Sequence, residues 1–363
     1  MKQTQRIRRE LHQIPELDHQ LPKTIAYIKQ FLTGMQCRIF QPIPSAVCAY
    51  FDFNQSSTVA YRSDMDALAI QESNNISYCS KHMGQMHACG HDAHMAILLS
   101  FADYLNRRKN AKHNVLLIFQ PAEETTGGAK EIVETGLFAK FRVAALFGIH
   151  VKPGIKKGNI ASKSGYMMAK SAEITVDIKG KAVHIAQYSN GRDALWTACC
   201  FIQRLYEISN AYPNKDHLVK FGFCQSGQVC NALSDHTVLK GSLRVFADND
   251  FCFFRQRMMS LGEQLQKENG CEFTFHLSEG YPALYNDECL FEQARSLIPD
   301  MIALSKPDLL SEDFAYYGKA VKSLFFYLGI GDAPSLHSDH FDFDDSCLIE
   351  GVNIYRKLLA IDI

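Results

Sequence analysis

The sequence predicts an α/β fold in which a mixed sheet is interrupted by a smaller α+β insert. Two continuous apolar runs, at 115–119 and 143–149, are typical of strands buried on both faces of a parallel sheet. Helical patterns lie between such runs, for example at 95–105, where apolar residues recur on one face. Strands that alternate with helices favour a sheet covered by helices.

The first part of the chain supplies two helices and two strands. Apolar and basic residues at helical spacing predict a helix at 4–14, which Pro15 stops. A second helix is expected at 24–32. Strands are expected at 47–53 and 58–61, because these runs are apolar or alternating and turn residues bound them.

A change of pattern after Ser171 marks the insert. Alternating strands are expected at 172–178, 218–224 and 237–246, and a fourth strand at 271–277. Two apolar-periodic helices are expected, at 193–208 and 250–269. The resulting order, β-α-β-β-α-β, is that of a ferredoxin-like unit.

The α/β pattern resumes after Pro282. A helix is expected at 288–297, an apolar strand at 323–328 and a closing helix at 346–359. The length of 363 residues also suggests two domains. The predicted domains are a larger one formed by two segments and the insert between them, with the bounds 1–170, 281–363 and 171–280.

Composition excludes several classes of protein. Lys and Arg number 38 and Asp and Glu 39, so the net charge of −1 argues against a nucleic-acid or basic membrane-binding protein. The polar start of the chain carries no signal-peptide pattern, and no apolar run is long enough to cross a membrane. The 12 cysteines follow no disulfide framework and suit the reduced thiols of a cytoplasmic protein.

The stretch 86–94, Met-His-Ala-Cys-Gly-His-Asp-Ala-His, concentrates metal-binding side chains. Cys and neutral His hold borderline-soft divalent ions such as zinc. One residue between Cys89 and His91 is too tight for a zinc finger, and no C-x2-C pair lies nearby. Taken alone, the stretch is also compatible with a buried cysteine among loop histidines.

Acidic and histidine residues follow successive predicted strands. Asp64 and Asp66 come after the strand at 58–61, Glu123 and Glu124 after the next, and His150 ends a third. Open α/β sheets carry their chemistry at the carboxyl ends of strands. Two adjacent glutamates are unfavourable neighbours there without a cation. Each group alone could be a solvated turn, but their repetition at one edge predicts a metal site, to which His337 or His340 could add a ligand.

Six motifs together resemble one family. They are Arg-Ser-Asp-Met-Asp-Ala-Leu at 62–68, the stretch at 86–94, Phe-Gln-Pro-Ala-Glu-Glu at 119–124, Phe-Gly-Ile-His-Val at 147–151, Ser-Glu-Asp-Phe at 311–314 and Leu-His-Ser at 336–338. In this order, over nearly the whole chain, they resemble the metal-dependent amidohydrolases of the aminoacylase/carboxypeptidase clan. The most similar branch contains hippurate hydrolases, auxin-conjugate hydrolases and bacterial N-acetyldiaminopimelate deacetylases.

The resemblance implies a binuclear metal site in the larger, catalytic domain. Cys89 would bridge two divalent ions as a thiolate, and four further ligands would complete the shells: His91, Glu124, His150 and His337. Glu123 would be the general base for a metal-bound water, and Asp66 would orient a ligand. Zinc suits such a Cys/His/Glu shell best, although manganese, cobalt or nickel could occupy it. The resemblance also selects His337 over His340.

The insert would be the family's lid, which also forms its dimer contact, so a homodimer is expected. His184 would stabilise the oxyanion, in the family often from across the dimer. Asn231 and Arg244 would bind substrate, because the donor fork of arginine suits a carboxylate. Lid closure would then bring His184 and Arg244 to the substrate. Two departures affect this region: Gln187-Tyr188 lies where relatives carry Pro then His, and Ser234 replaces a proline.

The function implied is metal-dependent hydrolysis of the amide bond of small N-acyl amino acids, such as N-acetyl or N-benzoyl derivatives, with N-acetyldiaminopimelate among the candidates. No nucleic-acid or membrane partner is expected. Three alternatives stay open: a dipeptidase or aminoacylase of the same clan, an enzyme with Cys89 as covalent nucleophile, and a non-catalytic metal-binding relative.

Overall fold

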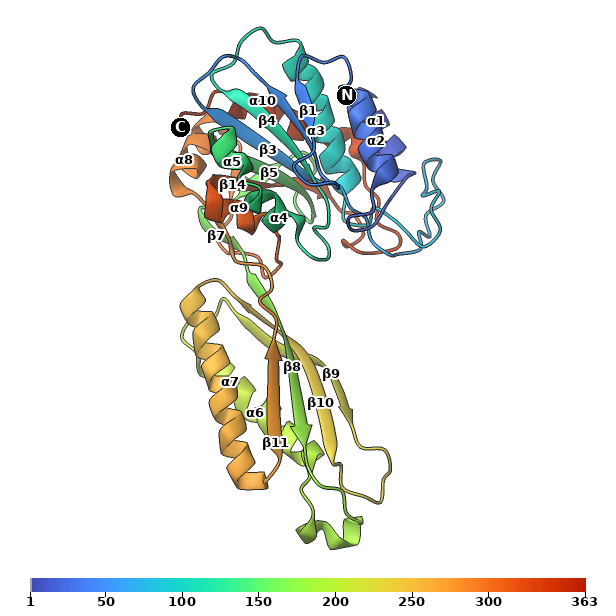
Figure 1. Cartoon of the computed structure of the whole chain (residues 1–363), viewed down its shortest axis with the longest axis vertical. Helices are drawn as coiled ribbons and strands as arrows, with labels where there is room; N and C mark the ends of the chain where they lie inside the picture. Colours follow the sequence, from blue (N-terminus) through green and yellow to red (C-terminus); the bar gives the residue numbers. More distant parts are fainter. Residues whose placement is uncertain (1) are drawn as a thin grey trace. The chain divides into compact units, whose positions relative to one another are not determined.

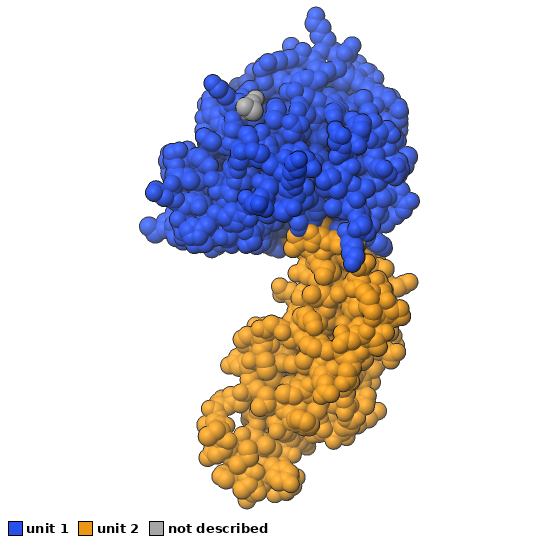
Figure 2. Space-filling view, turned by 180° about the vertical axis from the view of Figure 1, so that it is seen from behind, with its two compact units in different colours: residues 1–167, 284–306, 312–363 blue, residues 168–283, 307–311 orange. Residues whose placement is uncertain are grey.

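The computed structural model describes residues 2–363 and divides into two compact units (Figure 2). Unit 1 runs to Met167 and resumes at Leu284–Lys306 and Glu312–Ile363. Unit 2 comprises Met168–Ala283 and Pro307–Ser311. The last segment differs from the sequence prediction, which assigned it to the larger domain. It joins unit 2 because the backbone N–H of Ala169 donates to the carbonyl oxygens of Asp308 and Leu310, at 3.1 and 2.8 Å.

Unit 1 is built on an eight-stranded sheet of order β1-β2-β4-β3-β5-β14-β6-β13 (Figure 1). Four inner strands run parallel: β4 (Asn114–Gln120), β3 (Thr58–Asp64), β5 (Val143–Pro153) and β14 (Lys322–Gly331). The flanking strands are β1 (Arg38–Phe40), β2 (Val47–Phe51), β6 (Ile160–Ser162) and β13 (Ile302–Ala303). Antiparallel pairing of β2 with β4 and of β6 with β14 makes the sheet mixed, which confirms the predicted fold class.

One group of helices shares a large apolar core with this sheet. The group consists of α1 (Lys2–His12), α2 (Pro22–Leu32), α3 (His91–Asn106), α8 (Glu288–Leu297) and α10 (Leu348–Leu358). Their apolar faces follow the helical period that the sequence shows. A second group packs on β4, β5 and β14 outside that core: α4 (Gly128–Glu134), α5 (Leu137–Lys140) and α9 (Ala315–Ala320).

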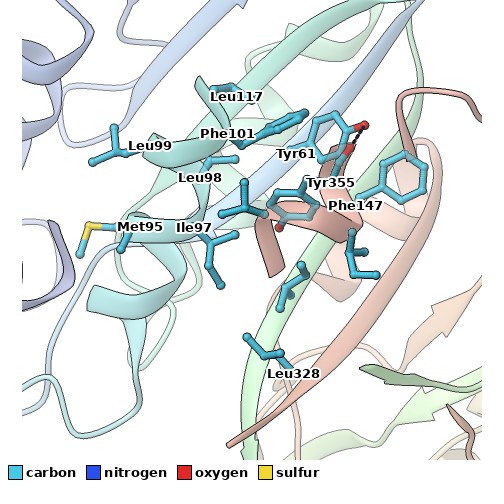
Figure 3. Close-up of a cluster of buried hydrophobic side chains, with 14 of the residues drawn as sticks. Tyr61, Met95, Ile97, Leu98, Leu99, Phe101, Leu117, Phe147, Leu328 and Tyr355 are labelled. Atoms are coloured by element: carbon cyan, nitrogen blue, oxygen red, sulfur yellow. Dashed lines mark hydrogen bonds between the residues drawn. The ribbon is translucent and has the colours of Figure 1, made fainter. Parts of the chain in front are cut away.

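The centre of the core joins β3 and α3 of the first segment of unit 1 to α10, near the C-terminus (Figure 3). The ring of Tyr61 on β3 meets the ring of Phe101 on α3 and that of Tyr355 on α10, each with a centroid separation of 4.8 Å. The Tyr61 hydroxyl also donates to the Tyr355 carbonyl oxygen at 3.5 Å. Aromatic pairs of this edge-to-face kind add roughly 0.5–1.5 kcal/mol to the energy of burial. The C-terminal segment is therefore an integral part of the larger unit.

Unit 2 has the predicted β-α-β-β-α-β order. Its elements are β8 (Lys170–Lys179), α6 (Ala194–Ala211), β9 (Leu218–Ser226), β10 (His236–Val245), α7 (Asp248–Asn269) and β11 (Glu272–Leu277). The sheet is antiparallel throughout, with the order β11-β8-β10-β9. Alternate residues of β8 and β11 point to the buried face, where α6 and α7 cover the sheet.

The sequence prediction missed the shortest elements. They are the helices α5 and α9, the strands β1, β6 and β13, a two-stranded sheet of β7 (Gly165–Met168) and β12 (Leu284–Asn286), and the 3-10 turns η1 (Ile185–Asn190) and η2 (Asp345–Cys347). Runs of only a few residues carry too little periodicity to be recognised. Among the described helices, none has both the length and the apolar character needed to cross a membrane.

Candidate metal centre

The loops after the parallel strands bring the predicted ligands to one edge of the sheet. Glu123 and Glu124 lie just beyond the end of β4, His150 lies near the end of β5, and His337 lies in the loop after β14. Cys89 precedes α3, whose first residue is His91. Because β3, β4, β5 and β14 are parallel, their carboxyl ends meet, as the sequence predicted for this edge.

A tight turn places Cys89 and His91. Gly90 between them has a φ of +87°, a conformation that favours glycine. A Cβ atom at this position would lie 2.4 Å from Cγ2 of Val151. The turn therefore requires glycine, both for its backbone conformation and for its close approach to β5.

His91 presents one bare ring nitrogen to the site. Its Nδ1 donates to the carbonyl oxygen of Asp66 at 2.8 Å, so Nε2 is the available acceptor. Nε2 is buried without a hydrogen-bond partner and lies 3.8 Å from Oε1 of Glu124. Burial opposes a charged ring, but Asp64, Asp66 and Glu124 raise the pKa of His91 to about 10. The surroundings thus favour a positive charge at this point, which a metal ion can supply.

Cys89 and His150 face each other. Sγ of Cys89 lies 3.5 Å from Nε2 of His150, whose Nδ1 donates to the carbonyl oxygen of Val151 at 2.7 Å. Burial, with the charges of Glu124 and Glu123, raises the pKa of the Cys89 thiol well above its ordinary value. A thiolate at this position therefore needs a cation beside it. A reactive free cysteine would need electropositive, partly exposed surroundings that lower the pKa of its thiol.

Glu124 and His337 complete this side of the site. Nε2 of His337 lies 3.3 Å from Oε1 of Glu124, an oxygen that is buried without a hydrogen-bond partner. Burial opposes the charge of Glu124, but His337 and His91 lower its pKa to about 2. The His337 side chain is 52% exposed, and its backbone N–H donates to the Ala88 carbonyl oxygen at 2.9 Å. His340 is 61% exposed and belongs to no ligand group of the described chain.

The possible ligand atoms form overlapping groups, with the atoms of each group within 4.8 Å of one another. Three of these groups are Cys89 with His91 and His150, Cys89 with Glu124 and His337, and His91 with Glu123 and Glu124. Imidazole nitrogen, thiolate sulfur and carboxylate oxygen suit borderline-soft divalent ions. The two bare buried atoms, Nε2 of His91 and Oε1 of Glu124, fit the same interpretation because buried polar atoms normally have partners.

Glu123 is held beside these ligands by Asp66. The backbone N–H groups of Glu123 and Glu124 donate to the two carboxylate oxygens of Asp66, each at 3.0 Å. Oε2 of Glu123 lies 4.0 Å from Nε2 of His91, and another group of carboxylate oxygens joins Glu123 to Glu312 and Asp313. Burial and the charges of Glu312 and Glu124 raise the pKa of Glu123 well above its ordinary value. A raised pKa makes a carboxylate a better proton acceptor than an ordinary one.

Sequence reasoning assigned no role to a buried polar network beneath the site. Arg62 binds Asp64 at 2.8 Å, Asp313 at 2.9 Å and Glu312 at 3.1 Å. His94 donates from Nδ1 to Asp64 at 2.7 Å and accepts from the Val151 N–H at 2.9 Å, so neither ring nitrogen is left for a metal. A signal existed in the sequence: β3 is buried throughout, yet it contains Arg62 and Asp64.

Unit 2 carries the three predicted lid residues at two separate places. His184 and Asn231 are exposed neighbours, since His184 bridges to Ala232 and the Ile185 N–H donates to the Asn231 carbonyl oxygen at 2.9 Å. They lie near the start of β10, where His236 pairs with Lys179 of β8.

Arg244 lies at the other end of the same strand, paired with Ser171. From His236 to Arg244 the strand extends about 26 Å. Within unit 2 of one chain, His184 and Arg244 therefore lie too far apart to contact the same small substrate. That lid closure brings both to the substrate stays a prediction, with His184 supplied from across a dimer. The antiparallel sheet fixes their separation, which the motifs alone do not reveal.

The α/β sheet, the possible metal ligands at its strand ends and the adjacent glutamates Glu123 and Glu124 define a metal-dependent hydrolase of the amidohydrolase and aminoacylase clan, as the motifs predicted. The chain belongs to peptidase family M20/M25/M40, whose model matches residues 60–361. An uncharacterised hydrolase of Staphylococcus epidermidis is 33% identical over 97% of this chain and 96% of its own. A hydrolase of Staphylococcus aureus USA300, also uncharacterised, is 32% identical over the same shares.

Two solved structures are similar over almost the whole chain. A protein assigned as an aminohydrolase from methicillin-resistant Staphylococcus aureus has a TM-score of 0.89 and 29% identity, covering 98% of this chain and 95% of its own. The YXEP protein of Bacillus subtilis, described as a dinuclear metal-binding peptidase of family M20, has a TM-score of 0.86 and 28% identity, covering 99% and 97%.

Proposed function

We propose that this hydrolase cleaves the amide bond of small N-acyl amino acids, such as N-acetyl or N-benzoyl derivatives. The observation that supports the proposal is that two adjacent glutamates of one loop face different groups. Glu124 faces His91 and His337, as a ligand does, whereas Glu123 also faces Glu312 and Asp313. The Asp66 carboxylate holds the backbone of both glutamates. One loop therefore offers a ligand and a base side by side.

We propose that two divalent ions occupy the site, with Cys89 shared between them and four other ligands: His91, His150, Glu124 and His337. Cys89 belongs to two of the ligand groups, which suits a bridging thiolate. When bound, such ions lower the pKa of a water and polarise the amide carbonyl. The carbonyl oxygens of Asp66 and Val151 keep Nε2 of His91 and of His150 as the ligand atom. The dinuclear site named for the YXEP protein supports the count of two, and zinc suits these donors best.

In this proposal Glu123 takes the proton of the attacking water and passes it to the departing amine. Its burial, at 7% exposure, limits competition from bulk water for that proton. Asp66 positions the base through the loop backbone, since both its carboxylate oxygens accept hydrogen bonds from the loop. An intact base also favours an enzyme over a non-catalytic relative.

Unit 2 would contribute the substrate contacts, and it would do so as a homodimer. Arg244 would bind the substrate carboxylate: it is half-buried, donates to Ser311 and Ser242, and makes no ion pair with a described carboxylate. His184 would stabilise the oxyanion with Asn231 beside it. Because about 26 Å of β10 separates them from Arg244, the His184 that completes a site would come from a second copy of the chain.

A dipeptidase is the second candidate, because the family model and the YXEP protein both carry the name peptidase. The two activities differ in the acyl part of the substrate. Hydrolysis of N-acetyl-L-amino acids at least tenfold faster, by kcat/KM, than of the matching glycyl dipeptides would favour the deacylase. The reverse ratio would favour the dipeptidase.

The decisive test of the site measures bound metal and turnover together. Elemental mass spectrometry on the purified protein is expected to find about two divalent ions per chain, lost in Cys89→Ala. Cys48→Ala is the matched control, because Cys48 is also buried but lies on β2. Absence of metal, or equal metal in Cys89→Ala and wild type, would contradict the proposed centre. Detection of an acyl group on Cys89 by mass spectrometry during turnover would instead support covalent catalysis by the thiol.

A further inference from the structure

The loop between β4 and α4 carries both glutamates and has an unusual backbone. Ala122 is buried with a φ of +57°, a region that L-residues rarely adopt. The chain then folds back on itself: the Gly127 N–H donates to the Ala122 carbonyl oxygen at 2.9 Å, and a Cβ on Gly128 would lie 2.2 Å from the Pro121 carbonyl oxygen. Such a conformation persists only where its surroundings fix it.

Asp313 joins the two ends of this loop. Its Oδ2 accepts a hydrogen bond from Nε2 of Gln120, the last residue of β4, at 2.7 Å. The same oxygen accepts from the backbone N–H of Ala129, in the first turn of α4, at 3.0 Å. Its Oδ1 accepts from Nη2 of Arg62 at 2.9 Å. Asp313 has no exposed surface, so water does not compete for these bonds.

Arg62 and Gln120 are themselves held in place. Nε of Arg62 donates to Oε1 of Gln120 at 2.8 Å, and the hydroxyl of Tyr317 donates to the same oxygen at 2.9 Å. This leaves Nε2 of Gln120 directed at Asp313. The amide orientation of Gln120 follows from these partners, because Arg62 can only donate.

We propose that Asp313 is a positioning residue for hydrolysis: it fixes the two ends of the loop at 121–128, while Asp66 fixes its middle, so that Glu123 and Glu124 are held in place together. The proposal rests on the proposed function of these two glutamates. It assigns a role to the Ser-Glu-Asp-Phe motif at 311–314, whose aspartate reaches the loop across 193 residues of chain.

The hydrogen bonds of Asp313 to Arg62, Gln120 and Ala129 form a clamp on the loop. The substitution Asp313→Asn tests this clamp with almost no change in side-chain size. The amide has one oxygen and one NH2 group, so a donor must face either Arg62 or the pair of Gln120 and Ala129. Either orientation sets a donor against a donor and releases part of the loop. A shift of about 1 Å at a reacting group costs on the order of 10²-fold in rate, and loss of a residue that supports metal ligands weakens metal binding by roughly 10–100-fold.

The experiment compares metal-loaded wild type, Asp313→Asn and Asp345→Asn. Asp345 is also a buried carboxylate of unit 1, but its partners are Gln5, Arg8 and Arg9. We expect Asp313→Asn to lower kcat about 100-fold with KM changed less than threefold, and to lower metal affinity in a chelator competition. Asp345→Asn is expected to lower the melting temperature without either change. Wild-type kcat and metal affinity in Asp313→Asn would overturn the proposal.

A double variant separates the clamp from general destabilisation. Gln120→Glu alone sets a carboxylate oxygen against Oδ2 of Asp313, so it should also lower kcat. Combined with Asp313→Asn, the new amide can donate to Glu at position 120, and part of the lost kcat should return. Losses that simply multiply in the double variant would count against the clamp.

The outcomes also separate this proposal from the proposed function. If wild type hydrolyses neither N-acyl amino acids nor dipeptides, the proposed function fails, and the metal-affinity comparison still tests the clamp. If wild type is active and Asp313→Asn matches Asp345→Asn in kcat, KM and metal affinity, the clamp alone fails.

Discussion

The two units differ in how firmly they hold their polar residues. At the strand ends of unit 1, His91, His150 and Glu123 are buried, and each is fixed by a hydrogen bond from its ring or its backbone. In unit 2, His184 and Asn231 are exposed. A site that must bind metal and activate water needs fixed geometry, whereas residues that contact substrate from a second subunit are arranged only on assembly. The contrast agrees with the proposed function, in which the metal ligands and the base come from unit 1 and the substrate contacts would come from unit 2.

The largest expected effect tests the chemistry of unit 1. Glu123→Gln keeps the size of the side chain and removes the base, so kcat should fall by roughly 10²–10⁴-fold. Bound metal should stay at the wild-type level, because the proposed ligand Glu124 is untouched. Steady-state kinetics with elemental analysis of the same preparation measures both. Metal-dependent turnover within threefold of wild type would show that Glu123 is not the base.

The next effect tests the assembly of unit 2. His184→Ala should lower kcat by roughly 10²–10³-fold if its ring stabilises the oxyanion. Mixed with Glu123→Gln under conditions of subunit exchange, it should regain activity. In an equimolar mixture half of the dimers then pair one copy of each variant, and each of these has one intact site, so about a quarter of wild-type activity should return. Two inactive variants that stay inactive when mixed, in a confirmed hybrid dimer, would place His184 in its own chain's site or outside catalysis.

The sequence was sufficient for residues whose position follows from one strand end. Glu123, Glu124 and His150 stand directly after or at the end of long apolar runs, and parallel pairing alone brings such ends together. The lid residues could not be placed in this way. His184 and Arg244 are matched by local motifs, but only the pairing of β10 with β8 shows that they lie at opposite ends of one sheet.

The buried polar network around Arg62 could not be predicted from the sequence either. Asp313 contacts Gln120 across 193 residues, and no local pattern encodes so distant a partner. The buried charges of Arg62 and Asp64 signalled that partners must exist, because unpaired charges are rarely buried. They did not say which carboxylates those partners would be, since Asp64, Glu312 and Asp313 all share the one guanidinium.

A smaller effect concerns the pH dependence of stability in unit 1. His12 is buried between Asp92, at 2.7 Å, and Glu72, at 3.2 Å. Burial opposes its charge, but the two carboxylates raise the pKa of His12 from 6.5 to about 9. Because the folded-state value is the higher one, the charged ring stabilises the fold fully below pH 6.5, and this contribution is lost as the pH rises through 9.

Denaturant unfolding across that window should therefore show a decline of as much as about 3 kcal/mol in wild type. His12→Asn should be less stable at low pH, because it leaves Asp92 and Glu72 without this cation, and its curve should lack that decline. The difference between the two proteins is the quantity to measure, since other groups titrate equally in both. Parallel curves for wild type and His12→Asn would contradict the ionised pair.

The smallest effect is expected for the equivalent contact in unit 2. His236 and Asp177 lie 2.9 Å apart, but their side chains are 50% and 27% exposed, so water screens the pair and stabilises both groups when they are separated. Such surface pairs contribute about 0–1 kcal/mol. His236→Gln, which can still donate to Asp177, should change the free energy of unfolding by less than about 1 kcal/mol. A loss as large as that for His12→Asn would mean that the face of β10 carrying His236 is buried in solution, as it would be if a second copy of the chain packed there.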